Sequence, residues 1–208
     1  MVDKDSWTNT QEEREELFDL VDTAPILKYN KKINRLVNLK SYREQLRRYN
    51  LYPINLHQKM LIDLLFDQEV PQKSIIGLAG SGKTFLALLT SIIMVNDLKW
   101  YDEIIITRPT VPMEYDVGFL PGTEEEKMDP YLRGFKDNLE YITQCKHLSK
   151  DRKDEYSFSM YNISIESMAY MRGKNIHRKI LIIDEAQNST LRAMKTMLTR
   201  IADDSIVI

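Results

Sequence analysis

Apolar and polar positions alternate along the chain with the period of helices in some segments and of strands in others. From Pro53 onward the pattern predicts helices over 55–67, 83–95, 124–144 (interrupted near Pro130) and 189–202, and strands over 73–76, 103–107, 162–166, 179–183 and 205–208. Residues 180–183 are all Ile or Leu, which is typical of a strand buried on both faces. Such strands alternating with helices predict an α/β domain with a mostly parallel sheet flanked by helices.

The residues before this domain have a different pattern. Residues 11–21 predict a helix with a narrow apolar stripe, and residues 26–50 predict one or two basic amphipathic helices. The pattern breaks at Tyr52-Pro53. We therefore expect a charged helical extension over 1–52 and a main domain over 53–208.

Composition excludes several classes of protein. With 43% hydrophobic and 29% charged residues, the chain is neither disordered nor collagen-like. No apolar run approaches the roughly 20 residues that span a bilayer, and the polar, acidic N-terminus has no signal-peptide apolar region. The single cysteine, Cys145, excludes an internal disulfide framework. We expect a cytoplasmic protein without a membrane partner.

Charge is unevenly distributed beneath the formal net charge of -2. Residues 1–23 carry eight acids and two bases, whereas residues 24–50 carry eight bases and one acid. Tyrosines interleave with the bases of the second segment, as they often do in proteins that bind single-stranded nucleic acid. A solvated amphipathic helix facing the acidic N-terminus explains the pattern equally well. Both interpretations stay open.

A phosphate-binding loop is the strongest chemical signal. The stretch matches G-x-x-x-x-G-K-[ST] and comprises Gly77, Leu78, Ala79, Gly80, Ser81, Gly82, Lys83 and Thr84. Backbone amides must turn inward around phosphate oxygens, which favours glycine, and the following helix directs its positive N-terminal end at the same phosphates. Lys83 supplies a charge to the β- and γ-phosphates, and Thr84 supplies a hydroxyl to magnesium. Only seven glycines occur in the chain, and three lie in this loop.

Two carboxylates follow the buried strand 179–183. Hydrolysis of a nucleoside triphosphate needs one carboxylate on magnesium and a second that positions or deprotonates water. We assign Asp184 to magnesium, together with Thr84, and Glu185 to water. Acids also follow strands as helix caps, so the assignment of this pair to catalysis depends on the phosphate loop upstream. Gln187 is a candidate sensor of the γ-phosphate or of a partner, or else a solvated loop residue.

Gln58 is the candidate for recognising the base. A glutamine amide can pair with the N6 and N7 atoms of adenine, which selects ATP over GTP. Asn55 and Gln58 also have the spacing of a capping box at the start of a helix, and the two roles are compatible.

Arginines are candidates for contacts with phosphate or nucleic acid. Arg108 ends a strand, and Pro109 forces it out of helical geometry, at the carboxyl edge of the sheet. A structural salt bridge is the alternative for Arg108. Arg133, Arg172 and Arg200 are weaker candidates for neutralising charge on the phosphate, in this chain or in a neighbouring subunit.

With these motifs in place, the chain resembles the PhoH-like ATPases, the phosphate-starvation-inducible family. The resemblance runs from about Pro53 to the last residue and rests on GLAGSGKTFLAL (77–88), ITRPTV (106–111), GFLPGTEEEKMDPYLRGFKDNL (118–139), MAYMRGKNI (168–176), ILIIDEAQNST (180–190) and MKTMLTR (194–200). It implies a P-loop NTPase core similar to the first motor domain of superfamily 1 helicases. It also implies ATP and Mg²⁺ as ligands, a role in RNA metabolism, and homo-oligomers.

The chain departs from the family pattern at its end. The family continues beyond the strand beginning at Ser205 into a Gly-Asp segment with a nearby glutamine, the γ-phosphate sensor, and this chain ends at Ile208. We therefore expect an ATPase domain truncated at its C-terminus that hydrolyses ATP weakly alone. The alternatives are a non-catalytic module that binds a partner when nucleotide is bound, and a fragment of a helicase or packaging motor.

Overall fold

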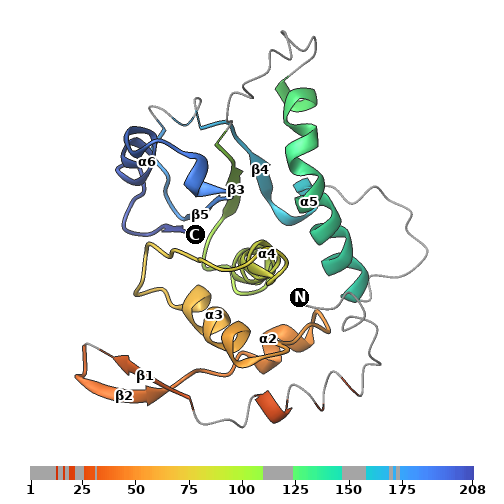
Figure 1. Ribbon diagram of the computed structural model, residues 1–208, viewed down its shortest axis with the longest axis vertical. Coiled ribbons are helices and arrows are strands. Elements are labelled where there is room, and N and C mark those ends of the chain that lie inside the picture. Colours follow the sequence, from red (N-terminus) through yellow and green to blue (C-terminus); the bar gives the residue numbers. More distant parts are fainter. Residues whose placement is uncertain are drawn as a thin grey trace.

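A four-stranded parallel sheet lies at the centre of the structure (Figure 1). The computed structural model describes residues 13, 16, 19–21, 26–30, 32–109, 124–146, 158–168, 171 and 174–208, without the side chains of 124–132. The strands are β3 (Glu103–Thr107), β4 (Ile163–Ile165), β5 (Lys179–Ile183) and β6 (Ile206–Val207), in the spatial order β4-β3-β5-β6. All three strand pairs are parallel. The predicted mostly parallel α/β sheet is confirmed.

Helices cover both faces of this sheet. They are α2 (Arg43–Arg47), α3 (Leu56–Phe66), α4 (Lys83–Ile92), α5 (Glu124–Cys145) and α6 (Leu191–Leu198). A π-helical turn, Ile93–Asp97, extends α4, and short 3-10 turns span Phe158–Tyr161 and Ala186–Asn188. Figure 1 shows α6 on one side of the strands and α4 on the other, with α3 beyond α4. None of the helices in the described ranges is long and apolar enough to cross a membrane.

The core has two parts because successive strand residues face opposite sides. Ile104 and Ile180 belong to the larger part, which packs against α3, α4 and α5. Ile105 and Leu181 belong to the smaller part, which packs against α6 and the segment that precedes β5. Both faces of β3 and β5 are therefore covered, as the continuously apolar sequence of β5 predicts.

The predicted helices over 26–50 are largely wrong. Residues Leu27–Asn30 (β1) and Arg35–Asn38 (β2) form an antiparallel hairpin, and only the short helix α2 follows it. The side chain of Asn30 accepts hydrogen bonds from the backbone amides of Lys32 and Ile33, and Asn34 has a left-handed φ of 51°. Asparagines of this kind stabilise a turn, which interrupts any helix through the basic segment.

Three smaller differences concern element boundaries. The predicted strand over 73–76 is absent: only Gln72 bridges to Val207, and Ile76 is 94% exposed. Helix α5 runs through Pro130 without interruption, although a proline at its seventh position removes one hydrogen bond within the helix. Helix α6 is shorter than the predicted 189–202: it begins after the N-cap Thr190 and ends at Leu198. Of the predicted helix over 11–21, only Glu13, Glu16 and residues 19–21 are described, and they are helical.

Residues just before Pro53 pack into the main core. Leu46, Tyr49 and Leu51 are buried with side chains of α3, α4 and α5. The Nζ of Lys146 donates to the Tyr49 hydroxyl at 2.9 Å and lies 4.3 Å from the centre of its ring. This contact joins the turn that follows α2 to the residue that follows α5.

Ion pairs attach the hairpin to α3 and the loop after it. Lys28 pairs with Asp63, which is buried, and Asp63 also accepts from the backbone amide of Lys40 at 2.8 Å. Lys32 pairs with Glu69 at 2.7 Å, and both of these side chains are largely exposed. Lys28 and Lys32 of the hairpin are thus paired with carboxylates of the same chain.

Replacing Asp63 with alanine is expected to destabilise the protein by roughly 1–3 kcal/mol, because it leaves the backbone amide of Lys40 without its acceptor and removes one of the two carboxylates, Asp63 and Asp67, that pair with Lys28. Glu69→Ala removes an exposed pair and is expected to cost about 1 kcal/mol or less. Urea denaturation of both variants gives the two free energies of unfolding. Equal losses in the two variants would contradict the role of burial at Asp63.

Candidate functional site

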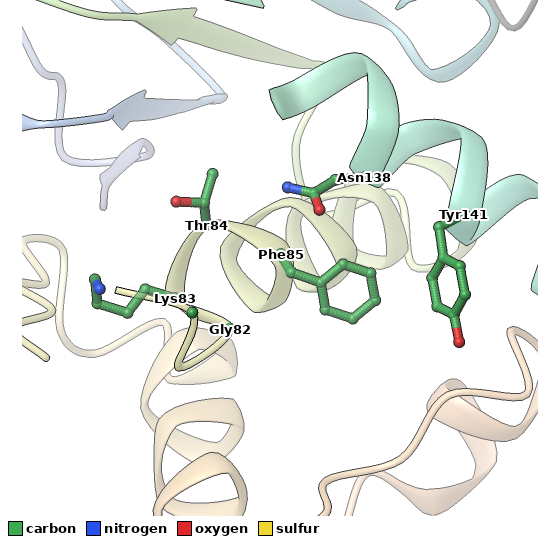
Figure 2. A pocket seen from close by; sticks show the side chains of 7 residues that line it. Gly82, Lys83, Thr84, Phe85, Asn138 and Tyr141 are labelled. Carbon is green, nitrogen blue, oxygen red and sulfur yellow. The ribbon is translucent and has the colours of Figure 1, made fainter. Parts of the chain in front are cut away.

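The phosphate loop connects Gln72, which bridges to β6, to the first turn of α4. Gly80 and Gly82 have φ values of 76° and 87°, which side chains rarely adopt, and Gly82 is the N-cap of α4. The Nζ of Lys83 donates to the carbonyl oxygens of Gly77 and Leu78, both at 2.8 Å. The lysine is folded back onto its own loop, and Figure 2 shows it at the start of α4. At the start of this segment, burial lowers the pKa of Lys73 to about 8.

The loop meets the acidic strand end directly. The hydroxyl of Thr84 donates to Asp184 Oδ1 at 3.1 Å. Asp184 follows β5, and its backbone amide donates to the carbonyl of Thr107 at 3.0 Å, which continues the β3–β5 ladder by one bond. The two predicted magnesium ligands thus lie side by side although a hundred residues separate them.

This pair of oxygens fits a magnesium site. Mg²⁺ is usually held by one or two carboxylates, water and substrate phosphates rather than by an all-protein cage. A hydroxyl and a carboxylate at the mouth of a phosphate loop are donors of that kind. Among the described residues, no group of three or more His, Cys, Asp and Glu side chains is placed to hold a metal, and a magnesium site of this type does not need one.

Glu185 lies next to two of the predicted partners. Its backbone has a left-handed φ of 52°, and its side chain is 41% exposed. The amide of Gln187 donates to one carboxylate oxygen, and the guanidinium of Arg108 lies 4.0 Å from the other. Arg108 also lies 3.8 Å from Asp184. The predicted salt bridge of Arg108 is therefore present, and it involves the candidate catalytic carboxylates themselves.

Gln58 lies against the phosphate loop. Its backbone amide donates to the side chain of the N-cap residue Asn55 at 2.9 Å, and its Oε1 accepts from the amide of Ile54 at 3.0 Å. The N-cap predicted at Asn55 is confirmed, while the Gln58 side chain bonds to the amide of Ile54 and not, as in a capping box, to that of Asn55. Its Nε2 lies 3.3 Å from the position of a Cβ atom on Gly82. The side chain is buried and is held in one orientation, while recognition of adenine stays a prediction.

The other predicted arginines are not brought to this site within the described residues. The backbone of Arg200 bonds to Ile176, which precedes β5, so Arg200 lies at the opposite end of the strand from Asp184. Arg133 is an exposed residue of α5. Arg172 lies outside the described residues.

Sequence reasoning missed one wall of the site. A cavity of about 410 Å³ adjoins the phosphate loop, and its lining consists of Gly80, Gly82, Lys83, Thr84, Phe85, Asn138 and Tyr141. Figure 2 shows Asn138 and Tyr141 on α5 facing the first turn of α4. The position of Phe85 directly after the motif was a usable signal. No local signal indicated that α5 contributes to the site, because its contribution depends on a contact between residues far apart in the chain.

Comparison with known proteins shows the family of the chain. A family model described as PhoH-like protein matches residues 50–208. Protein PhoH2 of Bacillus subtilis is 37% identical over 160 residues, which is 77% of this chain and 36% of the relative. A PhoH-like protein of Mycobacterium leprae is 37% identical over 156 residues, 75% of this chain and 42% of the relative. Another PhoH-like protein of Bacillus subtilis is 42% identical over 135 residues, 64% of this chain and 40% of the relative. The chain thus spans well under half the length of these relatives.

Gly82→Ala is expected to weaken binding of nucleotide and to destabilise the protein by roughly 1–2 kcal/mol, the cost of a left-handed backbone for a residue with a Cβ. The added methyl group also crowds Gln58 at 3.3 Å. Gly134→Ala is the matched control: a Cβ there meets nothing within 4 Å in a helix, and the change is expected to stabilise α5 by up to about 1 kcal/mol. Thermal unfolding measures the stability of both variants. A Gly82→Ala variant as stable as the wild-type chain would contradict the left-handed backbone at this position.

Proposed function

The chain belongs to the PhoH-like family, a family of P-loop NTPases, and we propose that it is a magnesium-dependent ATPase that converts ATP and water to ADP and phosphate. The hydrogen bond between Thr84 and Asp184 at 3.1 Å is the observation that carries this proposal. It joins the phosphate-binding motif to the strand end that carries the magnesium candidate Asp184 and, next to it, the water-activating candidate Glu185. A phosphate loop without that contact would support binding alone.

The triphosphate is bound by the loop and by the start of α4. Backbone amides of the loop and the positive end of the helix attract the phosphate oxygens. Lys83 exchanges its two carbonyl partners for the β- and γ-phosphates, which offer it a negative charge. Thr84 and Asp184 would hold Mg²⁺, which would supply positive charge that neutralises the triphosphate.

Glu185 acts on the attacking water. Its carboxylate orients the water and accepts a proton at one of its oxygens, for which its exposure leaves room. Gln187 and Arg108 hold that carboxylate from two sides, which limits its rotation. When the triphosphate is bound, Arg108 exchanges part of its pairing with Asp184 and Glu185 for charge on the γ-phosphate. Gln58 selects adenine over guanine through its amide.

We also propose the wider setting implied by the resemblance: a core like the first motor domain of superfamily 1 helicases, a cytoplasmic location, homo-oligomers and action on single-stranded RNA or DNA. The hairpin of β1 and β2 is the candidate surface for nucleic acid, since Tyr29 is exposed among its bases. A polyanion there competes with Asp63 and Glu69 for the lysines of the hairpin. This competition favours weak binding that depends strongly on salt.

Lys83→Ala is expected to lower kcat/KM for ATP by about 100-fold or more, since it removes a charge from the site of transition-state charge. Glu185→Gln is expected to retain Mg-ATP affinity while losing turnover to a similar extent. Lys195→Ala, an exposed lysine of α6, is the charge-matched control. Phosphate release measures turnover, and calorimetry measures the affinity for Mg-ATP. Tight binding without release in the wild-type chain, with or without RNA, would instead support the non-catalytic module.

A single-stranded RNA oligonucleotide is expected to raise turnover, and its affinity is expected to fall steeply as salt increases. Lys28→Ala combined with Lys32→Ala should reduce the salt slope, and Lys195→Ala should leave it unchanged. Fluorescence anisotropy at several salt concentrations measures the slope. A flat salt response would remove nucleic-acid binding from the hairpin, and strand separation by this chain alone would favour the motor fragment.

A further inference from the structure

The cavity beside the phosphate loop has the size and lining of a ligand site. Its volume of about 410 Å³ lies within the range of roughly 300–1,000 Å³ that is typical of small-molecule pockets. One wall is the loop together with the first turn of α4, and the opposite wall is α5 (Figure 2). Any group that extends from a phosphate bound at Gly80 and Gly82 into this space therefore meets α5.

Two aromatic rings form the apolar part of the lining. The ring centres of Phe85 and Tyr141 are 5.9 Å apart, and the ring planes make an angle of 60°. This edge-to-face packing fixes both rings. Each ring leaves part of its surface on the cavity, since both side chains line it and are only partly buried. A planar heterocycle can stack on such a surface.

The polar part of the lining is the amide of Asn138. Asn138 and Tyr141 are three residues apart on α5, which places them on the same face of the helix. Their neighbours Leu139 and Ile142 are buried in the core, so α5 presents this face from a rigid position. The Asn138 amide, which carries donors and an acceptor, has no hydrogen-bond partner among the described residues.

We propose that this cavity binds the nucleoside of the bound triphosphate, with the base stacked on Phe85 and Tyr141 and with Asn138 bonded to polar atoms of the nucleoside. The inference rests on the proposed function, because the triphosphate fixes where the nucleoside begins. It assigns stacking to α4 and α5; Gln58 does not line this cavity but lies against Gly82, which does. Helix α5 thereby becomes part of the nucleotide site.

Inorganic tripolyphosphate carries the phosphates without a nucleoside, so its affinity reports on the phosphate loop separately from the cavity. Calorimetry with Mg²⁺ compares ATP, GTP and tripolyphosphate on the full chain. Phe85→Leu and Tyr141→Leu keep apolar volume and remove the ring. Each is expected to weaken the affinity for ATP and GTP by about 5- to 100-fold, which is the effect of losing one stacked base. The affinity for tripolyphosphate is expected to change by no more than about twofold.

Three further variants sharpen the test. Tyr141→Phe keeps the ring and is expected to retain ATP affinity. Asn138→Ala is expected to weaken the affinity for ATP by about 3- to 10-fold, the effect of losing one hydrogen bond. Asp137→Ala, which alters an exposed neighbour on the same helix that does not line the cavity, is expected to change nothing. Thermal unfolding establishes that each variant is folded.

The outcomes are distinguishable. If the leucine variants leave ATP affinity unchanged, or weaken ATP and tripolyphosphate equally, the nucleoside does not bind in this cavity and the inference fails while the proposed function stands. Equal affinity of the wild-type chain for ATP and tripolyphosphate has the same meaning. If the wild-type chain binds neither ligand, the proposed function fails and the inference fails with it.

Discussion

The parallel register of β3 and β5 is the constraint on which the site depends. Thr107 lies opposite Ile183 in that register, so the next residues, Arg108 and Asp184, leave the sheet at the same edge. The bond from the Asp184 amide to the Thr107 carbonyl holds this edge together. A register shift of one residue would turn Asp184 to the other side of the strand. The contact of Asp184 with Thr84 would then be lost.

The core maintains that register from both sides. Alternate residues of β3 and β5 are buried under different helices, so a shifted strand would bring the wrong residues to each layer. Helix α4 is buried along most of its length, which fixes where its N-terminus points. At the edge of the sheet, Gly80, Gly82 and Glu185 adopt left-handed φ values, which strain the backbone of Glu185. Other described residues, Asn34 and Lys99 among them, adopt such values away from this edge. Packing of the core offsets that strain.

The sequence predicts the centre of this fold better than its surroundings. Continuously apolar strands and the spacing of the phosphate loop are sufficient to locate β3, β5, α4 and the contact of Thr84 with Asp184. The basic segment misleads because its charges suit a helix, whereas Asn30 and Asn34 stabilise a turn. The strand expected over 73–76 fails because β6 pairs with this segment only around Gln72.

Long-range contacts account for what local pattern cannot predict in the site. Asn138 and Tyr141 lie on a helix whose spacing reveals an apolar face, yet nothing local indicates that this face meets Phe85. In the same way, Arg108 is recognisable as a strand-end residue, while its approach to both Asp184 and Glu185 follows only from the arrangement of β3 beside β5. Arg200, a weaker candidate for contact with phosphate, lies instead at the opposite end of β5 from Asp184.

The most direct test of this account is the magnesium dependence of ATP affinity, measured by calorimetry in the wild-type chain and in Asp184→Asn. The account predicts that Mg²⁺ strengthens binding of ATP to the wild-type chain. It also predicts that the variant loses this increment while its affinity for metal-free ATP is retained or increased, since a negative charge beside the phosphates is removed. An equal effect of Mg²⁺ on both proteins would contradict the central claim that Thr84 and Asp184 form the magnesium site.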